Sequence, residues 1–293
     1  MPEGRIVKAL SGFYYVKSDD KIYACKGRGL FRNQNITPLV GDFVTFDQTN
    51  DEEGYITEIK PRKNELIRPP IANISQAVVV NAANHPKFSP LLLDRFLVIL
   101  ELKKIKPLII ITKKDLATAK QIKKIEEYKE DYKRLGYEVQ FLSLTEDADI
   151  ETLIQFFEGE TTVLMGQSGV GKSTLLNVIN PQFNIKTGEV STTLGRGRHT
   201  TRHVELLEIN NGLVADTPGF SSIDFIDIEA EDLAQGFVEI RKHGKNCKFR
   251  SCLHDKEPDC AVKAALENGE IENYRYKHYL NFLQEILSRK PRY

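Results

Sequence analysis

A glycine-rich loop is the part of this 293-residue sequence whose residue types and spacing carry the clearest chemistry. Residues 166–173 read GQSGVGKS and match the pattern G-x-x-x-x-G-K-S/T, whose backbone N–H groups surround the phosphates of a bound nucleotide. In that pattern Lys172 reaches the β- and γ-phosphates, Ser173 binds Mg²⁺, and Thr174 is expected at the α-phosphate. The predicted phosphate-binding residues are Gly166, Gln167, Ser168, Gly169, Val170, Gly171, Lys172, Ser173 and Thr174.

The residues around this loop fit the positions that the motif requires. Residues 161–165 (TTVLM) are β-branched and apolar, which predicts a buried strand, and residues 172–179 (KSTLLNVI) predict the start of a helix. A strand, a glycine loop and a helix in this order direct the helix dipole at the phosphates. We therefore interpret the loop as a nucleotide site and not as a chance run of glycines.

A second motif predicts which base is read. Thr112, Lys113, Lys114 and Asp115 follow the apolar run 107–111 (PLIII). A carboxylate at position 115 can accept two hydrogen bonds from guanine, whereas adenine offers no such pair of donors. The stem of Lys113 is expected over the base, and Thr112 stands where Asn is commoner. These residues predict selectivity for guanine.

A short acidic motif is expected at the γ-phosphate. Asp216 and Gly219 belong to the sequence DTPG, which follows the strand-like run 212–215 and matches D-x-x-G. In that motif the aspartate supports Mg²⁺ through water and the glycine N–H meets the γ-phosphate. Ser143, at the end of the strand-like run 137–142, is the candidate for the last base-contacting loop.

A polar segment, residues 181–202, lies between these phosphate motifs, where a switch loop is expected. Thr200 or Thr201 is placed to bind Mg²⁺ when the γ-phosphate is present, and the sequence does not choose between them. Phe220 follows D-x-x-G where many GTPases use a glutamine to orient the attacking water. His199 is therefore the candidate for positioning that water, the alternative being that it contacts RNA or solvent.

Three of the four cysteines cluster with a histidine near the end of the chain. Cys247, Cys252, His254 and Cys260 have the spacing C-x₄-C-x-H-x₅-C. Three thiolates and one imidazole complete a closed tetrahedral shell, which predicts one structural Zn²⁺ with no position open for catalysis. Cys25 stands alone in a strand-like run and is expected to be a small core residue.

Composition and charge narrow the class of protein. The net charge is zero, but residues 240–293 carry 12 basic and 7 acidic side chains, so the tail is the candidate contact for a polyanionic partner. No apolar run approaches the length of a membrane span, and residues 1–5 lack the apolar core of a signal peptide. We expect a soluble, cytoplasmic monomer that does not bind membranes.

Three domains are expected. Short alternating runs at residues 5–9, 13–17, 21–25, 43–46 and 55–59 predict a small β-barrel, with an OB-fold as the leading choice. Beyond it, strands alternate with helices, which predicts an α/β domain with a mostly parallel sheet and ligand loops at the carboxyl ends of its strands. The expected divisions are an OB-fold RNA-binding domain at residues 1–68, a P-loop GTPase domain at residues 69–228, and a mainly helical zinc-binding domain at residues 229–293.

Basic and aromatic residues of the barrel are candidates for nucleic-acid binding. They are Lys26, Arg28, Arg32, Tyr14, Tyr15 and Tyr23. The alternative is that the tyrosines only pack the barrel and the cations keep its surface soluble.

The base-reading tetrad precedes the phosphate loop, the reverse of the usual GTPase order, so the motifs are circularly permuted. Together with the run GRGRHTT, the motif DTPGF, the predicted barrel and the cysteine spacing, this order resembles the ribosome small subunit-dependent GTPase A family, also called RsgA, YjeQ or YloQ. The resemblance implies weak GTP hydrolysis with Mg²⁺, accelerated by the small (30S) ribosomal subunit. It also implies contact with 16S rRNA and a role in late small-subunit maturation.

Two other classes of protein are alternatives to a GTPase switch. A P-loop kinase with a zinc-bearing lid would prefer adenine, against which Asp115 argues. An RNA-binding scaffold with structural GTP would barely hydrolyse the nucleotide, and turnover with and without small subunits separates it from a switch.

Overall fold

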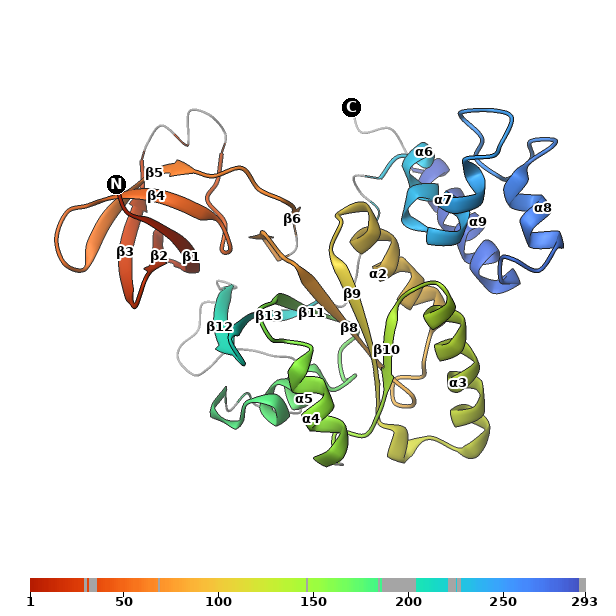
Figure 1. Cartoon of the computed structure of the whole chain (residues 1–293), viewed down its shortest axis with the longest axis horizontal. Helices are drawn as coiled ribbons and strands as arrows, with labels where there is room; N and C mark the ends of the chain where they lie inside the picture. Colours follow the sequence, from red (N-terminus) through yellow and green to blue (C-terminus); the bar gives the residue numbers. More distant parts are fainter. Residues whose placement is uncertain are drawn as a thin grey trace. The chain divides into compact units, whose positions relative to one another are not determined.

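The computed structural model describes residues 1–28, 31, 36–67, 69–145, 147–183, 185, 204–220, 225 and 228–289 (Figure 1). The side chains of residues 147–149 and 216–220 lie outside this description. The chain divides into two compact units. Unit 1 contains Met1–Val80 and Ser143–Ser221, and unit 2 contains Asn81–Leu142 and Ser222–Tyr293.

Five strands form an N-terminal barrel in unit 1, as predicted. They are β1 (Glu3–Leu10), β2 (Phe13–Ser18), β3 (Lys21–Gly27), β4 (Phe43–Gln48) and β5 (Glu53–Ile59). β1, β2 and β3 pair antiparallel, β3 pairs with β5 in parallel, and β4 pairs with both β5 and β1, which closes the barrel. Each strand contributes a fully buried side chain to the interior: Ile6, Val16, Cys25, Phe46 and Ile56. Cys25 is a core residue, as expected.

The rest of unit 1 is an α/β layer. Its elements are β6 (Glu65–Leu66), β7 (Ile71–Ala72), β8 (Gln76–Ala82), α4 (Asp147–Gln155), β11 (Thr161–Met165), α5 (Lys172–Ile179), η2 (Pro181–Phe183), β12 (Glu205–Ile209) and β13 (Gly212–Phe220). β11 pairs in parallel with β8 and β13, and β12 pairs antiparallel with β13. Every residue of β8 and β11 is buried, as expected for strands covered on both faces. β11 has the predicted bounds, and α5 begins at the predicted residue, Lys172.

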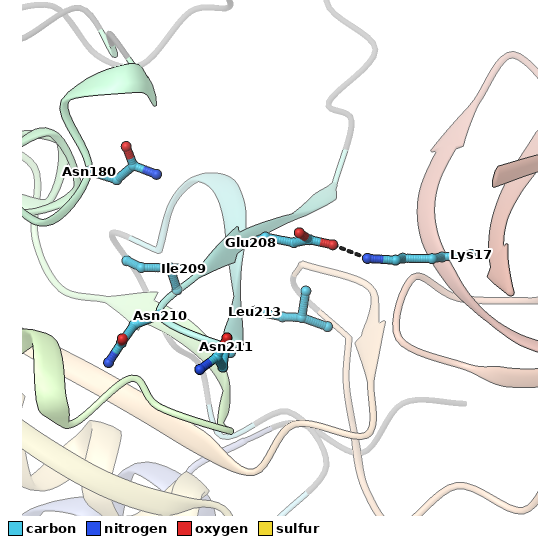
Figure 2. Close-up of a pocket in the computed structure, with 8 residues that line it drawn as sticks. Lys17, Asn180, Glu208, Ile209, Asn210, Asn211 and Leu213 are labelled. Atoms are coloured by element: carbon cyan, nitrogen blue, oxygen red, sulfur yellow. Dashed lines mark hydrogen bonds and ion pairs between the residues drawn. The ribbon is translucent and has the colours of Figure 1, made fainter. Parts of the chain in front are cut away.

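The barrel and the α/β layer share a sheet, because β1 changes partner along its length. Its first residues pair with β4, and Lys8 pairs with Glu205 of β12. The ammonium of Lys8 lies 2.9 Å from the Glu205 carboxylate, and Lys17 of β2 forms an ion pair with Glu208 (Figure 2). A polar cavity of about 500 Å³ lies beside this second pair and the β12–β13 turn. Strand β12 was not predicted from the sequence.

Unit 2 begins with elements from the middle of the chain. They are α2 (Pro90–Leu102), β9 (Lys106–Thr112), η1 (Lys114–Leu116), α3 (Ala119–Arg134) and β10 (Glu138–Phe141). β9 and β10 pair in parallel. The hydroxyl of Ser89 caps α2, and Thr118 and Gln121 form a capping box at the start of α3. These caps mark where the two helices begin.

The C-terminal part of unit 2 is mainly helical, as predicted. It contains α6 (Ala230–Leu233), η3 (Ala234–Gly236), α7 (Val238–Gly244), α8 (Ala261–Glu267) and α9 (Asn273–Leu287). Their apolar side chains form one core, which includes Phe225, Phe237 and Phe282. Among the described helices, none is long and apolar enough to cross a membrane.

A buried ionic network connects these late helices to α2, and no sequence pattern predicted it. Arg275 of α9 is 1% exposed and donates to both carboxylate oxygens of Glu239, at 2.6 and 3.0 Å. It also pairs with Asp94 of α2, which is 0% exposed and accepts from the Tyr132 hydroxyl at 2.6 Å. Removing one partner of such a network leaves a buried charge uncompensated, which typically costs about 3–5 kcal/mol.

Candidate nucleotide and metal sites

The phosphate loop connects β11 to α5 in unit 1, and two glycines set its course. Gly166 has φ +139°, and a Cβ on it would lie 2.1 Å from the carbonyl oxygen of Val80. Gly171, with φ +100°, is the N-cap of α5. Other residues adopt these conformations only with strain. Because the first N–H groups of a helix lack intrahelical partners, the start of α5 is suited to phosphate oxygens.

Lys172 is held within the phosphate loop. Its ammonium donates to the carbonyl oxygens of Gly166 at 2.7 Å and Gln167 at 2.6 Å. Burial lowers the pKa of Lys172 to about 8, so the side chain is a partly desolvated cation at neutral pH. A cation in such a place interacts more strongly with an anion than one in bulk water. Ser173 and Thr174 follow in the first turn of α5.

The base-reading tetrad follows β9 in unit 2. Thr112 is fully buried, and its hydroxyl donates to the carbonyl of Asn81 at 3.1 Å. Lys113 has a left-handed backbone with φ +60°, and its ammonium donates to the carbonyl of His85. Asp115 lies in η1 with an exposed side chain. Asn81 and His85 were not predicted from the sequence, although polar residues at or just beyond the carboxyl end of a buried strand are a usual place for ligand contacts.

Ser143, the remaining predicted base contact, makes local bonds in unit 1. It is fully buried, and its hydroxyl shares a 2.7 Å hydrogen bond with the hydroxyl of Thr145. It also accepts from the Thr145 N–H at 3.3 Å. These bonds shape the turn that follows β10.

Two consecutive residues of β8 support the two loops, one in each unit. In unit 1, the Val80 carbonyl lies against Gly166 and leaves no space for a larger residue there. In unit 2, the Asn81 carbonyl accepts from Thr112, and the N–H of Ala83 donates to the carbonyl of Thr112 at 2.9 Å. The end of this apolar strand therefore determines the backbone course at both motifs.

The D-x-x-G motif lies within a strand and not directly after one. β13 continues to Phe220 and includes Asp216 and Gly219, because pairing with β11 and β12 extends it beyond the predicted run 212–215. Of the predicted switch residues, His199, Thr200 and Thr201 lie outside the described residues.

The predicted metal ligands converge in unit 2. The ligand atoms of Cys247, Cys252, His254 and Cys260 all lie within 4.8 Å of one another. The Sγ of Cys260 lies 3.8 Å from the other two sulfurs and 3.4 Å from Nδ1 of His254. A tetrahedral Zn²⁺ with typical bond lengths requires about 3.8 Å between sulfurs and about 3.5 Å between sulfur and nitrogen. The four side chains therefore fit a tetrahedral metal ion.

Neighbouring side chains hold the metal loop, residues 247–260, in this shape. The hydroxyl of Tyr276 donates to the carbonyl of His254 at 2.6 Å, and that of Tyr279 donates to the carbonyl of Leu253 at 2.7 Å. Glu257 accepts from the N–H of Leu253 at 2.8 Å. Burial lowers the pKa of His254, which favours the neutral imidazole that binds metal.

The predicted nucleic-acid candidates of the barrel mostly contact the barrel itself. Arg28 forms an ion pair with Asp47, and the ring of Tyr23 packs 5.1 Å from that of Phe46. The ammonium of Lys26 lies over an aromatic ring at 5.0 Å. These contacts agree with the alternative that the residues serve the barrel. Tyr14 and Tyr15 are half-buried, and Arg32 lies outside the described residues.

Comparison with known proteins connects this geometry to one family. The family model described as RsgA GTPase matches residues 59–226, and the model described as RsgA N-terminal domain matches residues 3–56. The "Small ribosomal subunit biogenesis GTPase RsgA 2" of Oceanobacillus iheyensis is 58% identical over 293 residues, with all of both chains covered. The "Small ribosomal subunit biogenesis GTPase RsgA" of Bacillus subtilis is 55% identical over 298 residues, again with both chains fully covered.

Solved structures agree with the sequence comparison. YloQ, described as a circularly permuted GTPase, is 52% identical with a TM-score of 0.85, and the match covers 100% of this chain and 97% of that one. YjeQ from Thermotoga maritima is 34% identical with a TM-score of 0.86, and the match covers 99% of each chain. The chain belongs to the RsgA GTPase family.

Proposed function

We propose that this protein is a GTP-hydrolysing switch that acts on the small ribosomal subunit during its late maturation. The observation that carries the proposal is the phosphate loop, whose curled backbone encloses the ammonium of Lys172 at the start of α5. The names of the relatives from Oceanobacillus iheyensis and Bacillus subtilis supply the ribosomal role.

One GTP is proposed to bind both motifs. The phosphate loop and Lys172 hold the phosphates, Asp115 reads the guanine edge, and Lys113 and Ser143 flank the base. Ser173, Asp216 and either Thr200 or Thr201 hold Mg²⁺. When bound, Mg²⁺ neutralises charge that develops on the phosphates. His199 orients the attacking water, because Phe220 has no group that can do so.

The metal loop is proposed to hold one structural Zn²⁺. Its donor set uses all four tetrahedral positions, which suits structure and leaves no open site for catalysis. The metal would then keep the basic tail folded, and the tail and the barrel would both bind 16S rRNA. We further propose three functional domains, at residues 1–68, 69–228 and 229–293, in a monomer that works in the cytoplasm.

We propose that Phe225 couples the D-x-x-G motif to the tail. It follows the D-x-x-G motif by a few residues, is 2% exposed, and packs 5.0 Å from the ring of Phe282 in α9. The guanidinium of Arg95 lies over Phe225 at 4.5 Å and bonds Glu285 of α9 at 2.8 Å. A change in the D-x-x-G segment on hydrolysis would therefore pull on the core of the tail.

The test is GTP turnover titrated with purified small subunits, large subunits and free 16S rRNA. We expect acceleration by small subunits alone, and His199→Ala should lose that acceleration. Asp115→Asn should lose GTP and gain xanthosine triphosphate, because an amide can donate to the oxygen that replaces the guanine amino group. ATP preference with transfer to an acceptor would favour a kinase, and slow turnover that small subunits leave unchanged would favour a scaffold.

A further inference from the structure

A cavity of about 280 Å³ lies in the barrel where β1 meets β4. Arg5 of β1, Phe43 of β4, Lys17 of β2 and Lys60, which follows β5, all line it. Phe43 is 45% exposed, so part of its ring is accessible to a ligand. The cavity therefore combines three cations with an accessible ring.

Arg5 carries a charge that the described protein does not balance. Its guanidinium donates to the hydroxyl of Thr161 at 2.8 Å and to the carbonyls of Asn73 at 3.0 Å and Gly41 at 3.3 Å. All three acceptors are neutral, and within the described residues no carboxylate forms an ion pair with it. Burial lowers the pKa of Arg5 to about 10, which still leaves it charged at neutral pH. A half-buried cation without a counterion is stabilised by an incoming anion.

The remaining charges of the cavity can rearrange. Lys60 pairs with Glu3 and Lys17 with Glu208, and these side chains are all partly or largely exposed. Exposed ion pairs contribute little, so either lysine can exchange its carboxylate for a phosphate. The lining of the cavity carries three cations and two carboxylates, Glu3 and Asp19, and Glu208 lies outside this lining. The balance favours an anionic ligand.

Phe43 adds a requirement that a simple anion does not meet. The guanidinium of Arg5 lies 5.0 Å over its ring, so the cation and the aromatic surface are adjacent. A nucleotide joins a phosphate to a flat base, and bases stack on exposed aromatic side chains without regard to sequence.

We propose that this cavity binds one nucleotide of a single-stranded RNA segment, with its phosphate at Arg5 and Lys60 and its base against Phe43. The site differs from the face formed by the second and third strands, which OB-folds commonly use. The inference rests on the proposed function, since the small ribosomal subunit would supply the RNA.

The experiment measures binding of the full chain to a fluorescein-labelled decauridylate, to a duplex of the same length, and to purified small subunits. Phe43→Ala should weaken decauridylate binding about 5- to 150-fold, the usual range for loss of one stacked base. Phe43→Tyr should restore it. The affinity for RNA falls as salt rises. Lys60→Gln should make the slope of log affinity against log salt less negative by about 0.7, the value for one phosphate contact.

Tyr55→Ala is the matched control, because Tyr55 is 42% exposed on the same barrel and does not line the cavity. It should change decauridylate affinity less than twofold. Equal binding by wild type and Phe43→Ala would overturn the inference, as would an equal loss in Tyr55→Ala. If Phe43→Ala weakened binding to small subunits but left decauridylate binding unchanged, the cavity would bind a protein and not RNA. That result would also overturn the inference. GTP turnover of the wild type with small subunits tests the proposed switch separately from the RNA cavity. Small subunits can accelerate that turnover even if Phe43→Ala binds RNA normally.

Discussion

The phosphate loop and the metal loop both curl their backbone around a ligand site, but different residues set the two shapes. The phosphate loop takes its positive φ angles at Gly166, Gly169 and Gly171. The metal loop takes them at His254 and Asp259, where a left-handed backbone costs roughly 1–2 kcal/mol per residue. Its shape is supported from outside, by hydroxyls of α9.

The difference suggests that each loop suits the lifetime of its ligand. A glycine loop holds its course without a ligand, so nucleotides can enter and leave. A strained loop with external support suits a metal that stays bound, because the metal offsets the strain. The four predictions below test this contrast.

Loss of the metal should have the largest effect. Binding of structural zinc in short metal-dependent folds is worth about 10–16 kcal/mol, so Cys260→Ser or a strong chelator should unfold the metal loop. Metal content and amide hydrogen exchange over residues 245–262 would show it. Cys25→Ala is the control, since that residue packs the barrel and should leave one Zn²⁺ per chain. Full metal content in Cys260→Ser would contradict the assigned ligand set.

Lys172→Ala should have the second largest effect, because it removes the cation of the phosphate loop. Removing one preorganised charge-stabilising group typically costs about 10²–10³-fold in turnover, and we expect a loss of that order in single-turnover GTP hydrolysis. Lys120→Ala, an exposed change at the start of α3, should keep the wild-type rate. Metal content should be equal in both variants. Near-normal turnover in Lys172→Ala would mean that the phosphate loop does not take part in catalysis.

Gly166→Ala should destabilise unit 1 by about 2–4 kcal/mol, because the new Cβ would meet the Val80 carbonyl at 2.1 Å in a conformation that favours glycine. Urea unfolding gives the value. Gly136→Ala has the same kind of φ, at +91°, but nothing within 4 Å of its Cβ, so it should cost only about 1–2 kcal/mol. Equal costs at the two sites would mean that strand β8 does not restrict the loop.

Tyr279→Phe should have the smallest effect, since it removes one hydrogen bond to the metal loop. The bond to the Leu253 carbonyl is 2.7 Å long, and loss of such a bond costs about 1 kcal/mol. Competition with a chromophoric chelator should show zinc bound roughly fivefold more weakly. Tyr55→Phe, which alters an exposed hydroxyl, should leave zinc affinity unchanged. No change in Tyr279→Phe would mean that the metal alone sets the loop.

Local patterns predicted much of the molecule. The strand before the phosphate loop has the expected bounds, the helix after it begins where expected, the five barrel strands are present, and the four metal ligands converge. Each of these follows from residues close together in the chain. The residues of the switch segment lie outside the described structure, so the roles predicted for His199, Thr200 and Thr201 stay predictions.

The features that the sequence did not predict depend on residues far apart in the chain. Strand β12 (ELLEI) has two glutamates in five residues, and it pairs with β1 because Lys8 and Lys17 face those glutamates from the barrel. Arg275 is an ordinary cation in the sequence, and its burial depends on Glu239, 36 residues away, and on Asp94, 181 residues away. A periodic pattern reports which residues are buried, but it does not report which distant residue lies opposite.

The divided pairing of β1 has a consequence for protein synthesis. Lys8 leaves the ribosome long before its partner Glu205, which follows 197 residues later. At bacterial rates of up to about 20 residues per second, that interval is at least roughly 10 s. During this interval, the part of β1 that will pair with β12 is an unpaired strand edge, and a strand from another chain can pair with it. The barrel can close early through β4, but it is sealed against aggregation only when translation is two-thirds complete.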